Sequence, residues 1–185
     1  TKTNTKAPTC TEDGYTGDSY CGDCCEIVGS GDAIPALGHN YEGIFCTVCG
    51  EVYRPSLNVA MIPVGFFSRG GYAANADAYN QAILSYGADV MVLYAVDQNI
   101  TSFNNADMPA VLAEALKDVY PYTVYGSNLS YEDGTYGFMV LSKYPIVEGE
   151  FESFPVFGSE LFNRTMIDVN GVTVDIFTGR MGNQN

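Results

Sequence analysis

The chain is 185 residues long, and 8 lysines and arginines against 22 aspartates and glutamates give it a formal net charge of −14 at pH 7. A hydrophobic content of 46% is sufficient for a packed core and excludes wholesale disorder. The negative charge has the wrong sign for neutralising a phosphate backbone, so we expect no nucleic-acid partner. No run of apolar residues approaches the ~20 that a membrane-spanning helix needs, so we expect no membrane span.

The composition changes along the chain near Pro55. All six cysteines lie in the first 49 residues, in a segment with few aliphatic side chains that cannot bury a conventional core. From Leu57 onward, long aliphatic stretches contain no cysteine. We therefore predict two domains, a Cys-rich module over residues 1–56 and an α/β domain over residues 57–185.

Two pairs of cysteines in the module have the spacing of metal ligands. Cys21 and Cys24 form one C-x-x-C pair, and Cys46 and Cys49 form a second pair. Two such pairs can each lie on a tight turn and present four thiolates to one tetrahedral Zn²⁺, as in a zinc ribbon. A structural zinc ion of this kind would replace the missing hydrophobic core.

The cysteine pattern leaves two further arrangements open. An even number of cysteines in a small, loop-rich module also fits an all-disulfide framework. In a mixed arrangement, zinc occupies the two C-x-x-C pairs while Cys10 and Cys25 form a disulfide. His39, the only histidine, could replace one thiolate, but we expect it to be a turn residue with local hydrogen bonds.

Three stretches of the module, CTEDGYTGDSYCGDC, IPALGHNY and CTVCG, follow one another between Ala7 and Tyr53. They resemble a short Cys-rich repeat found on secreted and surface proteins of Gram-positive gut bacteria. The resemblance implies a secreted or cell-surface location and a role as a spacer or attachment module, and it implies no catalysis. The chain departs from the repeat at Cys25, where the repeat carries glycine.

The first part of the second domain alternates between strand and helix patterns. The apolar run over residues 57–65 predicts a buried strand, and residues 75–87 have helical spacing with a terminal glycine. Residues 88–97 form a second continuous apolar run, and residues 107–120 predict a helix that Asp107 caps ahead of a proline. This order predicts at least one parallel strand pair with a helical cover.

The rest of the chain is rich in strand patterns. The predicted strands cover residues 122–128, 136–146, 149–157, 162–171 and 172–180. The Asn170-Gly171 pair, where the last two of these strands meet, is a strong hairpin signal.

The stretches LNVAMIPVG, ADVMVLYAVD, YGFMVLSKYPI and VTVDIFTGRM occur in this order over residues 57–181. They resemble the motifs of the endonuclease/exonuclease/phosphatase superfamily, whose members are metal-dependent phosphodiesterases and phosphatases. The resemblance implies an α/β fold. Its architecture would be an α+β sandwich that corresponds to the first half of the four-layered fold of this superfamily.

The residues that carry the chemistry of the superfamily are replaced. Pro63 stands where the resemblance implies an asparagine, and Ala95 stands where it implies the glutamate that ligates Mg²⁺. Phe138 replaces a second asparagine, and Arg180 replaces a histidine. Because Mg²⁺ binds through carboxylate oxygens, we expect no magnesium cofactor and no catalytic residue, and the domain reads as a pseudoenzyme.

We therefore expect a non-catalytic, secreted or cell-surface protein with a structural or interaction role, whose partners include other surface proteins. The alternative is a metal-dependent phosphodiesterase or nuclease whose second half is missing from this chain. A half-fold would leave one face of its sheet uncovered, so we also expect a homo-oligomer or a filament formed through that face. The residues expected on it are Val59, Met61, Val92, Met139 and Ile176.

Overall fold

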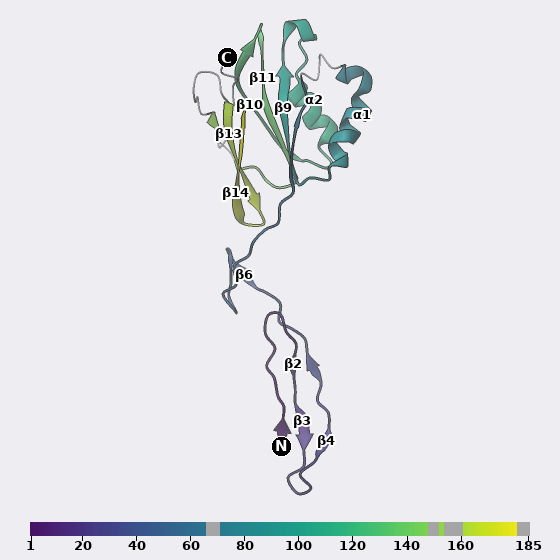
Figure 1. Cartoon of the computed structure of the whole chain (residues 1–185), viewed down its shortest axis with the longest axis vertical. Helices are drawn as coiled ribbons and strands as arrows, with labels where there is room; N and C mark the ends of the chain where they lie inside the picture. Colours follow the sequence, from purple (N-terminus) through teal and green to yellow (C-terminus); the bar gives the residue numbers. More distant parts are fainter. Residues whose placement is uncertain (66–70, 148–151, 154–160, 181–185) are drawn as a thin grey trace. The chain divides into compact units, whose positions relative to one another are not determined.

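The computed structural model describes residues 1–65, 71–147, 152–153 and 161–180. The chain divides into two compact units, Thr1–Arg54 and Pro55–Asn185 (Figure 1). The predicted domain boundary lies two residues beyond the division between these units. No helix in the described part of the chain is long and apolar enough to cross a membrane.

The first unit, which we call the Cys module, is built from short antiparallel strands and turns. They are β1 (Lys2–Thr3), β2 (Gly14–Tyr15), β3 (Asp18–Tyr20), β4 (Ile27–Gly29), β5 (Ala33–Ile34), β6 (Tyr41–Glu42) and β7 (Phe45–Cys46). The pairs and sheets are β1-β3-β4, β2-β5 and β6-β7. Cys10 and Cys46 are the only hydrophobic residues of this unit that are buried, so the module has no aliphatic core.

The second unit contains a four-stranded sheet in the order β10-β11-β9-β8. Its strands are β8 (Val59–Pro63), β9 (Val90–Gln98), β10 (Tyr122–Tyr131) and β11 (Gly134–Ser142). β8 and β9 are parallel, as the strand and helix patterns predict, and the other neighbours are antiparallel. The 3₁₀ helix η1 (Thr101–Phe103) follows β9.

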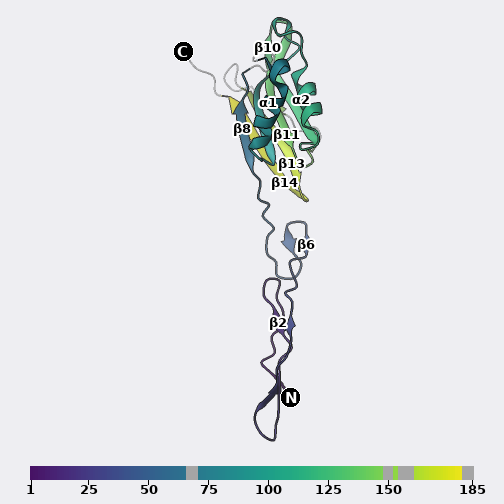
Figure 2. The same cartoon turned by 90° about the vertical axis from the view of Figure 1, so that its right-hand side faces the viewer.

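Two helices cover one face of this sheet, as the two views in Figures 1 and 2 show. α1 (Tyr72–Ser85) connects the parallel strands, and α2 (Met108–Leu116) follows η1. The Asp107 side chain caps α2 by accepting a hydrogen bond of 3.3 Å from the Ala110 N–H, as predicted. Side chains between the helices and the sheet form the larger apolar cluster, which includes Leu93, Leu112 and Met139.

A second sheet packs against the other face of the first. Its strands are β12 (Glu152–Ser153), β13 (Leu161–Val169) and β14 (Val172–Arg180), in the order β12-β13-β14. The predicted hairpin joins β13 to β14, with φ of 54° at Asn170 and 85° at Gly171, values that suit these residue types. Val92, Phe138 and Ile167 belong to the apolar cluster between the two sheets.

The layers of helices, first sheet and second sheet confirm the predicted fold class. The predicted uncovered face is only partly uncovered, because Val92 is buried under the second sheet and Met139 packs on the helix side. Val59 and Met61 on β8 remain 48% and 49% exposed. Of the predicted strand 149–157, all but residues 152–153 lies outside the described residues.

Candidate metal centre and the strand ends of the second unit

Four potential ligands come together in the Cys module. Cys10, His39, Cys46 and Cys49 each contribute one ligand atom, and these atoms all lie within 4.8 Å of one another. Backbone hydrogen bonds draw the first of them to the others, since the Gly38 N–H donates to the Cys10 carbonyl at 3.0 Å. We call this group the Cys10 cluster.

The distances within the Cys10 cluster suit a tetrahedral metal ion. The sulfur atoms of Cys10 and Cys46 lie 3.8 Å apart, and Cys49 Sγ lies 3.4 Å from His39 Nδ1. With Zn–S bonds of ~2.3 Å and Zn–N bonds of ~2.0 Å, a tetrahedral ion separates two sulfurs by about 3.8 Å and a sulfur from a nitrogen by about 3.5 Å. The geometry therefore fits three thiolates and one imidazole around a single ion.

The imidazole of His39 is held by two further side chains. Its Nε2 lies 3.3 Å from a carboxylate oxygen of Glu51, which leaves Nδ1 facing the sulfurs. The ring of Tyr41 stacks on it, with centroids 5.5 Å apart. A carboxylate on the second nitrogen of a ligating histidine fixes its tautomer and the orientation of its ring. His39 is thus oriented as a ligand.

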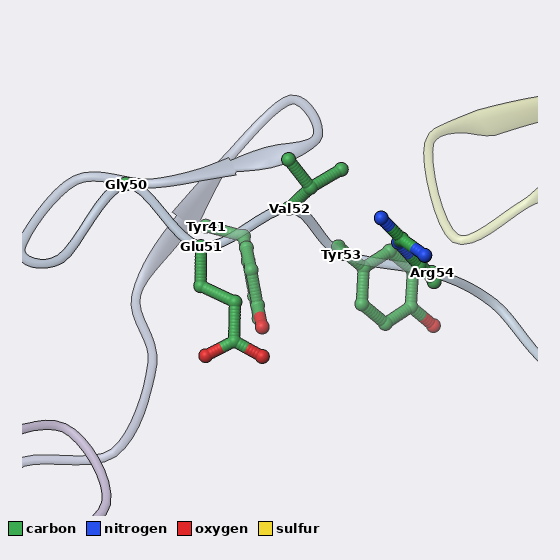
Figure 3. Close-up of a pocket in the computed structure, with 6 residues that line it drawn as sticks. All are labelled: Tyr41, Gly50, Glu51, Val52, Tyr53 and Arg54. Carbon is green, nitrogen blue, oxygen red and sulfur yellow. The ribbon is translucent and has the colours of Figure 1, made fainter.

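Beside this histidine lies a hollow of about 540 Å³, lined by residues that include Tyr41, Glu51 and Tyr53 (Figure 3). The rings of the two tyrosines lie 5.2 Å apart and are tilted by 54°. Burial and the negative charge of Glu51 raise the pKa of the Tyr41 phenol above its ordinary value.

Two of the thiols have shifted pKa values, in opposite directions. Backbone N–H groups, led by that of Cys49, lower the pKa of Cys46 to about 5, which favours its thiolate. Burial, followed by hydrogen bonds with its cysteine neighbours, raises the pKa of Cys10 to about 12. Without a cation, repulsion between neighbouring thiolates keeps some of the three cysteines of the Cys10 cluster protonated. Metal binding would therefore release protons from these thiols.

The Cys10 cluster differs from the expected set Cys21, Cys24, Cys46 and Cys49. The second C-x-x-C pair is present, but Cys10 and His39 join it, and the first pair lies in a separate turn between β3 and β4. Cys10 and Cys25 are not bonded to each other, and all six cysteines carry free thiols. Short-range spacing cannot reveal this set, because backbone pairing between residues 9–10 and 37–38 is what places Cys10.

The two C-x-x-C turns have the same backbone geometry. In residues 21–26 and 46–51, the N–H of the first residue donates to the carbonyl of the sixth, at 2.9 and 2.8 Å. The N–H of the fifth residue donates to the carbonyl of the first, at 3.1 and 2.9 Å. The fifth residue has a positive φ in both, 57° at Cys25 and 74° at Gly50. We call these turns the first and the second knuckle.

In the second unit, Ala95 forms a β-bulge near the end of the central strand β9. On β11, Phe138 pairs with Tyr94 and Gly137 pairs with Val96, so Ala95 is the extra residue. Its φ is 64°, a left-handed conformation that is costly for a residue with a Cβ. A β-bulge changes the direction in which a side chain points, but the side chain of Ala95 is only a methyl group.

The neighbouring positions are apolar. Phe138 is fully buried, and its ring lies 4.9 Å from that of Tyr94. Pro63 is exposed at the end of β8, where it pairs with Tyr94. Arg180 ends β14, and its side chain lies outside the described part of the structure. Pro63 and Arg180 thus end their strands, whereas Ala95 and Phe138 lie within β9 and β11. Pro63, Ala95 and Phe138 offer no side-chain ligand.

Comparison with known proteins assigns the second unit to a protein family. Residues 57–185 match the family described as PGAP2IP, C-terminal nuclease-like domain. The chain belongs to this nuclease-like family. No match was found among curated protein sequences.

The nuclease-like domain also resembles solved structures. An endonuclease/exonuclease/phosphatase family protein from Leptotrichia buccalis C-1013-b matches with a TM-score of 0.51 and 17% identity, over 69% of this chain and 55% of that chain. At this identity the likeness shows the fold alone.

Two further matches have lower TM-scores. An endonuclease/exonuclease/phosphatase from Beutenbergia cavernae DSM 12333 gives 0.43 at 22% identity, over 55% of this chain and 31% of that one. A D. rerio TDP2 humanized by 14 mutations gives 0.48 at 16% identity, over 69% and 48%. The chain thus spans between about a third and about half of the length of these structures.

Some polar residues in the described part of the nuclease-like domain are buried. Asp97, Thr165 and Thr178 are buried, and no hydrogen-bond partner is present in the described structure for the hydroxyls of the two threonines. Within the described residues of this unit, no three His, Cys, Asp or Glu side chains lie close enough together to share one metal ion. Mg²⁺ binds through carboxylate oxygens, and Ala95 supplies none at the position where the resemblance implies the glutamate ligand.

Proposed function

We propose that the nuclease-like domain is a catalytically inactive member of its family and that the chain is a structural or interaction protein. The observation that carries this proposal is Ala95 on its bulge. The backbone retains a conformation suited to aiming a functional side chain, while the residue itself has no ligand atom.

The aromatic pair next to the bulge supports the same conclusion. The rings of Tyr94 and Phe138 occupy space between the two sheets. A phosphodiester and a hydrated cation need hydrogen-bond donors and oxygen ligands in such a place. Apolar side chains in this space stabilise the domain but supply no hydrogen-bond donor or oxygen ligand for catalysis.

The experiment that tests the proposal measures hydrolysis of bis-nitrophenyl phosphate by the full chain with Mg²⁺ or Mn²⁺. We expect no turnover above the buffer rate, and none in an Ala95→Glu variant, because one carboxylate does not replace the other missing groups. Turnover that EDTA abolishes would instead support the rival function, a metal-dependent phosphodiesterase or nuclease.

For the Cys10 cluster we propose a structural zinc ion. Three sulfurs and one nitrogen in tetrahedral spacing are the ligands of closed structural zinc sites, which keep no open position for substrate. The module lacks an aliphatic core, so metal binding supplies the free energy that holds its turns together.

We further propose a secreted or cell-surface location, which the resemblance of the Cys module to a surface-protein repeat supports. The proposed interaction surface is β8, which forms the edge of its sheet in the described structure and carries the half-exposed Val59 and Met61. Pairing of this edge with that of a second copy would satisfy its backbone groups and cover both side chains.

A further inference from the structure

The first knuckle has the backbone of a metal-binding turn and half the ligands of a closed site. It repeats the hydrogen-bond pattern of the second knuckle, which contributes two thiolates to the Cys10 cluster. As in the second knuckle, the turn places two cysteines at its first and fourth positions.

No residue in the described part of the chain completes this half-site. No third His, Cys, Asp or Glu atom joins Cys21 and Cys24 within ligand distance of both. Cys21 is partly exposed and Cys24 is exposed, so both sulfurs are accessible from outside the molecule. Two thiolates alone do not close a structural zinc site, which takes four ligands.

We propose that the first knuckle binds one Zn²⁺ together with the first knuckle of a second copy of this chain. Cys21 and Cys24 from each copy supply four thiolates in the two-plus-two arrangement of a tetrahedral site. A two-fold axis passes through the ion, so a single exposed half-site on each chain is sufficient for a closed dimer. The site is independent of the proposed inactivity of the nuclease-like domain and of the β8 surface.

The test uses the full chain, reduced and loaded with Zn²⁺, and carries Met61→Asp to disable the β8 surface. Native mass spectrometry should find a dimer with three zinc ions, or about 1.5 per chain, one in each Cys10 cluster and one shared. Sedimentation should show that EDTA converts this dimer to monomer. Cys24→Ser should weaken dimerisation at least about tenfold and leave about one zinc per chain.

Cys25→Ser is the matched control, because Cys25 is exposed in the same turn and is not a proposed ligand. It should retain the dimer and its three zinc ions. The cobalt spectrum of the Cys10 cluster shows that each variant remains folded, since that cluster contains neither substituted residue. A monomer with one zinc ion, in which Cys21 and Cys24 are both alkylatable, would overturn the proposal. A monomer with two zinc ions, or a Cys21–Cys24 disulfide in the reduced preparation, would overturn it equally.

Discussion

The rings of Tyr94 and Phe138 lie 4.9 Å apart, at directly paired positions of β9 and β11. Their planes are inclined by 36°, within the offset arrangements that aromatic pairs favour. The pair lies beside the Ala95 bulge, where the superfamily that the sequence resembles has polar residues. This part of the sheet therefore contributes to the apolar core between the two sheets.

Phe138→Asn, which restores the amide implied by the resemblance, should destabilise the nuclease-like domain by ~3–5 kcal/mol. The change removes a fully buried ring and places an amide in an apolar cluster. Urea unfolding measures the loss. Phe177→Asn is the control, because Phe177 is 66% exposed and its replacement should cost under ~0.5 kcal/mol. Equal effects at both positions would contradict the packing role of Phe138.

Ala95→Gly should stabilise the domain by about 0.5–1 kcal/mol, because glycine adopts a φ of 64° without the steric cost of a Cβ. Thermal unfolding measures the gain. Ala88→Gly is the matched control: Ala88 is buried and has no positive φ, so the added chain entropy and lost packing should lower its stability. Loss of stability in both variants would show that the bulge carries no strain.

Removal of zinc by a chelator should unfold the Cys module and leave the nuclease-like domain folded, since the two units have separate interiors. Limited proteolysis should then cleave within residues 1–54 and spare the second unit.

His39→Ala should lower the zinc affinity of the Cys10 cluster at least about tenfold by removing one ligand, whereas Cys25→Ser should leave it unchanged. Unaltered affinity in His39→Ala would exclude His39 as a ligand.

Asp89 should make the second unit less stable in acid. The backbone N–H of Asn58 and the ammonium group of Lys143 lower the pKa of the Asp89 carboxyl. A folded-state pKa below the unfolded value of ~3.9 contributes stability that is present above about pH 4 and is lost as the pH falls through the folded-state pKa.

Asp89→Asn should therefore cost about 1–2 kcal/mol at pH 7 and reduce the difference in stability between pH 7 and pH 3. Urea unfolding over that pH range measures both effects. Asp77→Asn on the exposed side of α1 serves as the control and should change the stability little at either pH. The assignment fails if the Asp89 variant retains the full pH dependence of the wild type.

Self-association through β8 should strengthen as salt is added, because a net charge of −14 on each chain opposes approach at low ionic strength. In metal-free protein, Met61→Asp should abolish the association by placing a charge on the half-exposed edge. Val119→Asp is the control, since Val119 is similarly exposed and lies outside β8. A stable monomer of the wild type at tens of micromolar in sedimentation would rule out this surface.

Much of the fold follows from the order of residues alone. The apolar run that became β9 is a buried strand as predicted, whereas the run that became β8 is an edge strand with no fully buried residue, so its predicted burial is wrong. The intervening helical pattern predicts the parallel pairing of the two strands. Asn170 and Gly171 specify the hairpin because both tolerate a positive φ, and Asp107 specifies the start of α2. These features depend on neighbours within a few residues, so the sequence carries them directly.

The ligand set and the state of the strand ends depend on contacts between distant residues. Spacing identifies both knuckles, but only the pairing of residues 9–10 with 37–38 brings Cys10 to Cys46 and leaves Cys21 and Cys24 apart. The sequence likewise shows an alanine at position 95, but the bulge that aims it arises from the register between β9 and β11. Local patterns determined the elements, whereas long-range backbone pairing decided which side chains meet, because a register is a property of two segments together.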